Sequence, residues 1–184
     1  MRRPQHGHRL YGWWTVIGVA LIFAASCAGA KVESQATRAG ELEGAWRLAF
    51  SETIGPDGTR RPGRTHESLL VIADGYYSMN YAFGPQKSES FSKRFSPTDA
   101  EALARYRSLL VNAGRFELDG GLLRIHPEFA LVPEFVGGLG EFEYSLNGES
   151  LQLVWSKIES AEGIPDPNTA AGVRYVSRWQ RLPG

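Results

Sequence analysis

The sequence contains a single cysteine, Cys27. This excludes an intramolecular disulfide, and it excludes a thiol nucleophile or a cysteine-based metal site in the rest of the chain. Only His66 and His126 lie beyond the first 30 residues. They are not part of the close cluster with acidic residues that a zinc site requires, so we expect no metal and no cofactor.

The formal net charge is zero. Without an excess of Lys and Arg to neutralise phosphates, we expect no nucleic-acid partner.

Motifs of the common catalytic sites are also absent. The chain has no Gly-x-Ser-x-Gly nucleophile elbow and no phosphate-binding loop. Glu141 and Glu143 alternate with Phe142 and Tyr144, which places them on a solvated outer face and not in a general acid/base pair. A binding protein is therefore favoured over an enzyme. An isomerase- or cyclase-like enzyme with His126 or a tyrosine as acid/base remains an alternative.

Residues 1–30 have the layout of an export signal, because Arg2, Arg3 and Arg9 precede an uncharged apolar stretch that ends in small residues. Three interpretations are open. Residues 28–30 (Ala-Gly-Ala) fit a cleavage site, residues 24–27 (Ala-Ala-Ser-Cys) resemble a lipobox with lipidation at Cys27, and the apolar stretch is just long enough to remain as a membrane anchor. We expect an exported protein, periplasmic or membrane-anchored in the cell envelope. Any membrane contact would run through the N-terminal segment or a lipid on Cys27.

Residues 31–41 are polar and aperiodic, as in a tether, and residues 42–182 follow as one domain. Apolar and polar residues alternate in about eight segments, and three of the turns are Asp-Gly (74–75), Gly-Gly (120–121) and Asn-Gly (147–148). One helix is predicted over 97–113, plugging one barrel end or packing on the wall, with Ser96 as its N-cap. The fold class is therefore all-β with one helix, an antiparallel up-and-down β-barrel of about eight strands.

Several segments resemble the bacterial lipocalin-like domain family. Residues 41–48 (Glu-Leu-Glu-Gly-Ala-Trp-Arg-Leu) contain the Gly44-x-Trp46 signature, and residues 112–118 and the hairpin at 146–153 match further parts of the family pattern. A second lipocalin signature, built around Thr-Asp-Tyr, is absent. The resemblance implies a lipocalin-like barrel with Gly44, Trp46 and Arg178 as its structural signature. Arg178, or alternatively Arg181, would pack over the ring of Trp46.

The inward-facing side of the strands is rich in aromatic residues, which suits a cup for a small apolar molecule. If Arg124 and His126 both face inward, they would anchor a ligand carboxylate. The candidate ligand-binding residues are Tyr77, Tyr81, Arg124, His126, Tyr144 and Trp155. We thus expect an exported envelope protein that binds or carries a small hydrophobic molecule. In the alternative, side chains fill the barrel and its loops contact another protein.

Overall fold

The computed structural model describes residues 39–63, 68–82 and 90–184. The export segment, Cys27, most of the tether and His66 lie outside these residues, so the predictions made for them stay predictions. Among the described residues, no helix is both long enough and apolar enough to cross a membrane.

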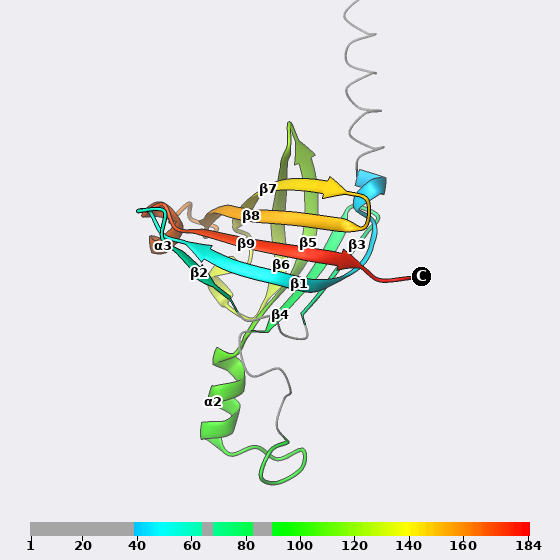
Figure 1. Cartoon of the computed structure of the whole chain (residues 1–184). Helices are drawn as coiled ribbons and strands as arrows, with labels where there is room; N and C mark the ends of the chain where they lie inside the picture. Colours follow the sequence, from blue (N-terminus) through cyan, green and yellow to red (C-terminus); the bar gives the residue numbers. More distant parts are fainter. Residues whose placement is uncertain (1–38, 64–67, 83–89) are drawn as a thin grey trace, which may run out of the picture. The chain divides into compact units, whose positions relative to one another are not determined.

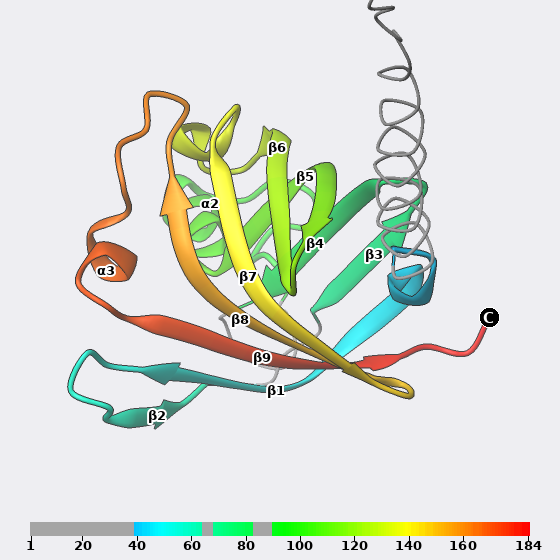
Figure 2. The ribbon, with the colours of Figure 1, turned by 90° about the horizontal axis from the view of Figure 1, so that it is seen from above.

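Nine strands form one antiparallel sheet in the described part of the chain. They are β1 (Gly44–Ile54), β2 (Arg60–Pro62), β3 (Leu69–Ala73), β4 (Tyr76–Ala82), β5 (Leu109–Asp119), β6 (Leu122–Ala130), β7 (Leu139–Asn147), β8 (Ser150–Glu159) and β9 (Arg174–Arg181). Because β1 pairs with both β3 and β9, eight strands close into a barrel, and β2 is an extra strand beside the end of β1. Consecutive strands of the ring are neighbours in space, as predicted for an up-and-down barrel (Figures 1 and 2).

Turn chemistry and alternation explain why these segments form strands. The three predicted turns connect β3 to β4, β5 to β6 and β7 to β8. Asp74 and Gly75 both have positive φ angles, of 50° and 78°, which suits a tight hairpin turn. On β6, Leu123 and Ile125 are buried while the residues between and after them are more exposed, so one face of the strand builds the core.

The predicted helix is shorter than expected. Helix α2 (Asp99–Arg107) has Thr98 and not Ser96 as its N-cap, with a capping box to Glu101. It ends before Leu109, because residues 109–115 pair with β4, and this tertiary pairing overrides the helical spacing of the sequence. No residue of α2 is buried, and Leu103 and Tyr106 are 47% and 44% exposed. The prediction that the helix plugs or packs on the barrel is therefore wrong. Three short helical segments complete the described fold: residues 39–42, η1 (Pro133–Phe135) and α3 (Pro167–Ala170).

One end of the barrel is closed around Trp46. Its side chain is fully buried, and its indole Nε1 donates to the carbonyl oxygen of Leu42, at the end of a helical segment over 39–42, across 2.9 Å. The guanidinium of Arg181 lies 4.1 Å from the Trp46 ring centroid and donates to the carbonyl oxygens of Glu43 and Glu41. In Figures 1 and 2 the start of β1 and the C-terminus lie at this end, and α3 lies at the other.

The assignment of Arg178 to Trp46 is wrong. Arg178 lies over the ring of Phe50, 4.1 Å from its centroid. The register between β1 and β9 explains the difference, since Trp46 is paired with Arg181, and a bulge between Leu48 and Phe50 brings Arg178 opposite Phe50. The alternative, Arg181, is the residue over the signature tryptophan.

Candidate functional site

A cavity of about 490 Å³ lies inside the barrel, toward the end opposite Trp46. Its walls come from the ends of β1, β4 and β8 and the starts of β5, β7 and β9, together with η1. Most of the lining side chains are apolar or aromatic, among them Met79, Tyr81, Leu110, Phe135, Phe142, Trp155, Ile158 and Tyr175. The volume is typical of pockets that take small molecules. The barrel is therefore not completely filled by its own side chains.

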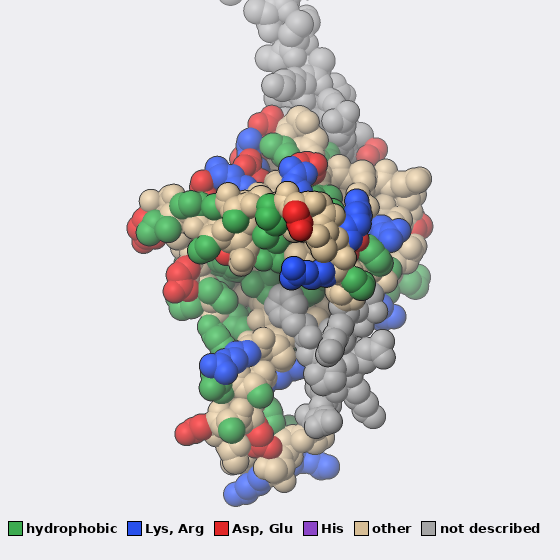
Figure 3. Space-filling model, turned by 60° about the vertical axis from the view of Figure 1, so that its left-hand side comes forward, with side chains coloured by type: hydrophobic (Ala, Val, Ile, Leu, Met, Phe, Trp, Pro, Cys, Tyr) green, Lys and Arg blue, Asp and Glu red, His purple; other side chains and the backbone are tan. Residues whose placement is uncertain are grey.

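Exposed apolar side chains occur at the same end of the barrel. Phe129 at the end of β6, Val136 after η1 and Ile164 between β8 and β9 are 63%, 43% and 64% exposed. Figure 3 shows hydrophobic side chains on the part of the barrel nearest α2, with charged side chains above them on the barrel and below them on the lowest part of the view.

Two of the six predicted ligand-binding residues line the cavity, Tyr81 and Trp155. Trp155 is held in place by stacking on Phe142, with ring centroids 5.0 Å apart. Tyr77 is 4% exposed and belongs to the core, and Tyr144 packs against the core from a partly buried position. Neither belongs to the described residues that line the cavity, so a ligand-binding role for them stays a prediction.

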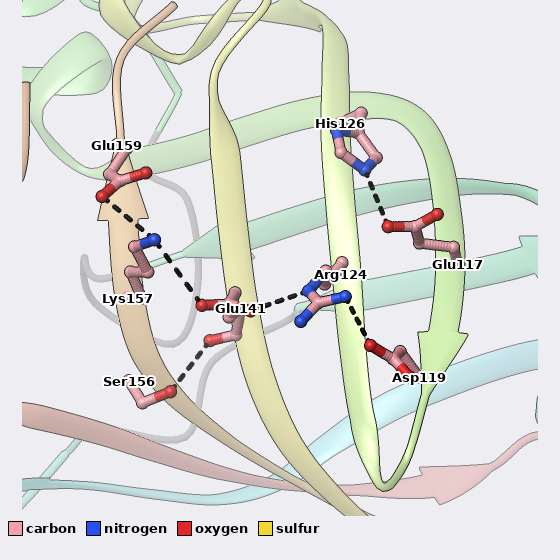
Figure 4. A network of polar contacts seen from close by, with 8 residues as sticks. All are labelled: Glu117, Asp119, Arg124, His126, Glu141, Ser156, Lys157 and Glu159. Atoms are coloured by element: carbon pink, nitrogen blue, oxygen red, sulfur yellow. Dashed lines mark hydrogen bonds and ion pairs between the residues drawn. The ribbon is translucent and has the colours of Figure 1, made fainter. Parts of the chain in front are cut away.

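Arg124 and His126 face outward, and the hypothesis that they anchor a carboxylate inside the barrel is wrong. They alternate on β6 with the buried Leu123 and Ile125, so the pleat directs them to the outer face. Arg124 is hydrogen-bonded to Glu141 and Asp119, at 2.8 Å each, and these bonds raise the pKa of its guanidinium (Figure 4).

His126 is 48% exposed at its side chain and lies 3.6 Å from Glu117, also on the outside (Figure 4). Figure 4 shows the same outer face continuing to Lys157, whose ammonium nitrogen is 3.0 Å from Glu159 and 3.9 Å from Glu141. Glu141 and Glu143 point away from the barrel interior, as the alternation predicted. The network links β5, β6, β7 and β8 across their outer surface and takes no part in the cavity.

The charged groups of the cavity wall are acidic. Glu52 is paired with Arg60 at 2.6 Å, and Asp166 accepts a hydrogen bond from the backbone N–H of Thr169 at the start of α3. No Lys, Arg or His belongs to the described residues that line the cavity. The described part of the chain also contains no group of three or more His, Cys, Asp or Glu side chains placed to hold a metal ion.

The tyrosines of the wall remain neutral at physiological pH. Burial raises the pKa of Tyr81, and a hydrogen bond with Ser51 offsets part of this increase. Burial and the nearby carboxylate of Asp166 raise the pKa of Tyr175. Both hydroxyl groups can therefore donate or accept hydrogen bonds, but neither is in the deprotonated form that a catalytic base requires.

Sequence reasoning missed Asn112. This residue is fully buried on β5, and neither polar atom of its side chain has a hydrogen-bond partner among the described residues. The alternation of Leu110, Asn112, Gly114 and Phe116 would have placed it on the inner face, but the start of this run was assigned to the helix. Asn112 and Trp155 both line a small recess of about 10 Å³, which shares Phe135, Trp155 and Ile158 with the main cavity.

Comparison with known proteins identifies the family. The crystal structure of a lipocalin-like protein from Bacteroides uniformis ATCC 8492 matches with a TM-score of 0.39 and 16% identity, covering 77% of this chain and 98% of that chain. Fatty-acid-binding protein 1 of Echinococcus granulosus matches with a TM-score of 0.33 and 12% identity, with the same coverage. No curated protein matches the sequence. The family model of the lipocalin-like domain matches residues 43–181, well over half of the chain, and the chain therefore belongs to the lipocalin-like domain family.

Proposed function

We propose that this protein is exported to the cell envelope and binds or carries a small hydrophobic molecule in its barrel. The observation that carries the proposal is the cavity of about 490 Å³, with its mainly apolar and aromatic wall. Burial of apolar ligand surface at about 25 cal/mol per Å² is the main favourable term available there. The exposed apolar side chains at the same end support it further, because they are apolar surface that a hydrophobic molecule can contact.

The two other functions suggested by the sequence have less support. A filled barrel that acts only through its loops does not account for the cavity. An enzyme with His126 as acid/base would need that histidine inside, yet it lies on the outer face beside Glu117. The acidic groups of the wall, Glu52 and Asp166, already have partners. Binding without turnover is thus the function that the cavity supports best.

Export is inferred from the sequence of residues 1–30. It is tested by expressing the intact chain in a bacterium and separating periplasm, membranes and cytosol. We expect the protein outside the cytosol. A Cys27→Ala variant that moves from the membrane fraction to the periplasm would identify a lipoprotein. If the intact chain stays in the cytosol, the envelope part of the proposal is wrong.

Ligand binding is tested by titrating the intact protein with N-phenyl-1-naphthylamine, a neutral apolar probe whose fluorescence rises in dry sites. We expect saturable one-to-one binding with a Kd on the order of 1 μM, about −8 kcal/mol. Leu110 lines the cavity, and Leu110→Trp should fill part of it and weaken binding. Leu109, next to it on β5, is not a lining residue, and Leu109→Trp is the matched control. A folded protein that shows no saturable binding would overturn the proposal.

A further inference from the structure

A small recess beside the cavity is lined by hydrogen-bonding side chains that nothing in the described chain satisfies. Asn112 is 0% exposed, and both its Nδ2 and its Oδ1 lack a partner among the described residues. The indole Nε1 of Trp155, a residue 9% exposed, lacks one too. A buried amide without partners is costly, and an apolar residue could occupy this position on β5 at no such cost. The pair therefore points to a group that arrives from outside.

The two side chains line the same recess. Its volume is about 10 Å³, and it shares the lining residues Phe135, Trp155 and Ile158 with the main cavity. Gly140 keeps this place open, because a Cβ atom there would lie 3.1 Å from the Trp155 Nε1 and 2.8 Å from Ile125 Cγ1. A recess of this size accommodates about one oxygen atom or one water molecule. Its lining side chains carry two donor nitrogens, Asn112 Nδ2 and Trp155 Nε1, and one acceptor, Asn112 Oδ1.

The charges around the cavity select further among ligands. An ionised carboxylate would have to leave water, and this requires a cation or several donors in its new site. The described lining residues provide no Lys, Arg or His, and they do include the carboxylates of Glu52 and Asp166. Arg124, the predicted carboxylate anchor, is on the outer face with Glu141 and Asp119. A neutral hydroxyl, carbonyl or amide group meets none of these difficulties.

We propose that the barrel selects neutral apolar molecules that carry one hydroxyl, carbonyl or amide group, held by Asn112 and Trp155, over fatty-acid-like carboxylates. The inference rests on the proposed function and specifies its ligand class. Asn112 determines specificity because its amide can donate to an oxygen and accept from a hydroxyl or an N–H. The aromatic wall takes the apolar remainder of the molecule.

The test compares decan-1-ol, decanamide and decanoate, which share one chain length, by displacement of N-phenyl-1-naphthylamine from the intact protein. At about pH 8, where decanoate is ionised, we expect the alcohol and the amide to bind at least about tenfold more tightly than decanoate. Lowering the pH until the carboxyl group is protonated should raise the affinity for the acid and remove most of the difference in affinity. The pH series also shows whether the charge of the ligand causes the discrimination.

Two variants identify the residue responsible. Asn112→Leu keeps the branched shape and removes an unpartnered buried amide, so it should fold, and its affinity for the alcohol and the amide should fall about tenfold or more relative to its affinity for the probe. Asn80→Leu is the matched control, since the Asn80 side chain lies near Ser78 on β4 and does not line the cavity.

The outcomes separate the two proposals. Equal binding of decanoate and decan-1-ol overturns the inference and leaves the proposed function standing. The same holds if Asn112→Leu binds both neutral ligands as the unchanged protein does, because the recess would then hold only structural water. If neither the probe nor any ligand binds, the proposed function fails as well.

Discussion

Arg181 should be the most important charged residue for the stability of the barrel, and Arg181→Met tests this. Its guanidinium lies 4.1 Å from the Trp46 ring centroid and donates to the carbonyl oxygens of Glu41 and Glu43. Its Nε also lies 3.2 Å from the carboxylate of Glu149. These contacts tie the last strand to the start of β1 and to the segment that precedes it, and so they close one end of the barrel.

The magnitude follows from the contacts that are lost. A cation over an aromatic ring contributes about 0.5–2 kcal/mol, and a hydrogen bond to a charged group contributes about 1.5–3 kcal/mol. The side chain of Arg181 is 23% exposed, and water can replace part of these bonds, so the lower ends of both energy ranges apply. The exposed Glu149 pair adds less than about 1 kcal/mol. We expect Arg181→Met to lower the free energy of unfolding by about 2–4 kcal/mol.

Arg178 provides a control in the same strand. It packs over Phe50 with the same centroid distance of 4.1 Å, but its side chain is exposed. Arg178→Met should therefore cost about 0.5–1 kcal/mol. The loss of unfolding free energy in Arg181→Lys should lie between those of the two methionine variants, because an ammonium keeps the charge and lacks the planar set of donors of a guanidinium. Urea unfolding of the intact protein, followed by tryptophan fluorescence, measures all three. Equal costs for the two methionine variants would refute the reasoning.

Three further predictions concern the backbone, the tyrosines and the outer face. Gly44 has a φ of 132°, and a Cβ there would lie 2.8 Å from Arg181 Nη1. Gly44→Ala should therefore cost about 1–3 kcal/mol in urea unfolding, and more than Gly58→Ala, where a Cβ meets nothing within 4 Å. Burial raises the pKa values of Tyr77, Tyr81 and Tyr175 above those in the unfolded chain, near 10. The unfolded chain thus loses these protons first, and the tyrosine contribution to the unfolding free energy should be constant from pH 8 to about pH 10 and fall above it. Urea unfolding from pH 8 to 11 measures this, and a pH dependence that Tyr77→Phe does not reduce would contradict it. Arg124→Ala should leave the affinity for the probe and for decan-1-ol unchanged in the displacement assay, and weaker binding would show that this arginine acts on the cavity.

The strands could be predicted from local chemistry, because turns and alternation are properties of neighbouring residues. Asp74-Gly75 and Asn147-Gly148 marked two hairpins that the structure contains. The helix boundary could not be predicted in the same way. Leu110 has helical spacing from Leu103 and Tyr106, but its segment also fits a strand, and only the pairing with β4 decides between them.

The candidate site was predicted less completely, because it depends on register. The alternation of Arg124 with Leu123 and Ile125 indicates an outward side chain, whereas its partners Asp119 and Glu141 come from β5 and β7 and follow only from the strand pairing. The bulge in β1 that separates the roles of Arg178 and Arg181 has no marker in the sequence. Aromatic content correctly indicated a cavity wall at Tyr81 and Trp155.

The two ends of the barrel differ in whether their buried polar side chains have hydrogen-bond partners. At the closed end, the indole of Trp46 and the guanidinium of Arg181 each have protein partners. In the recess beside the cavity, the side-chain amide of Asn112 and the indole N–H of Trp155 have no partner among the described residues, although both side chains are buried. A chain selected for stability alone would place an apolar side chain at position 112. An amide at this position costs stability that a hydrogen-bonding group in the recess would restore, and this is why Asn112 is the residue at which the proposed ligand class is tested.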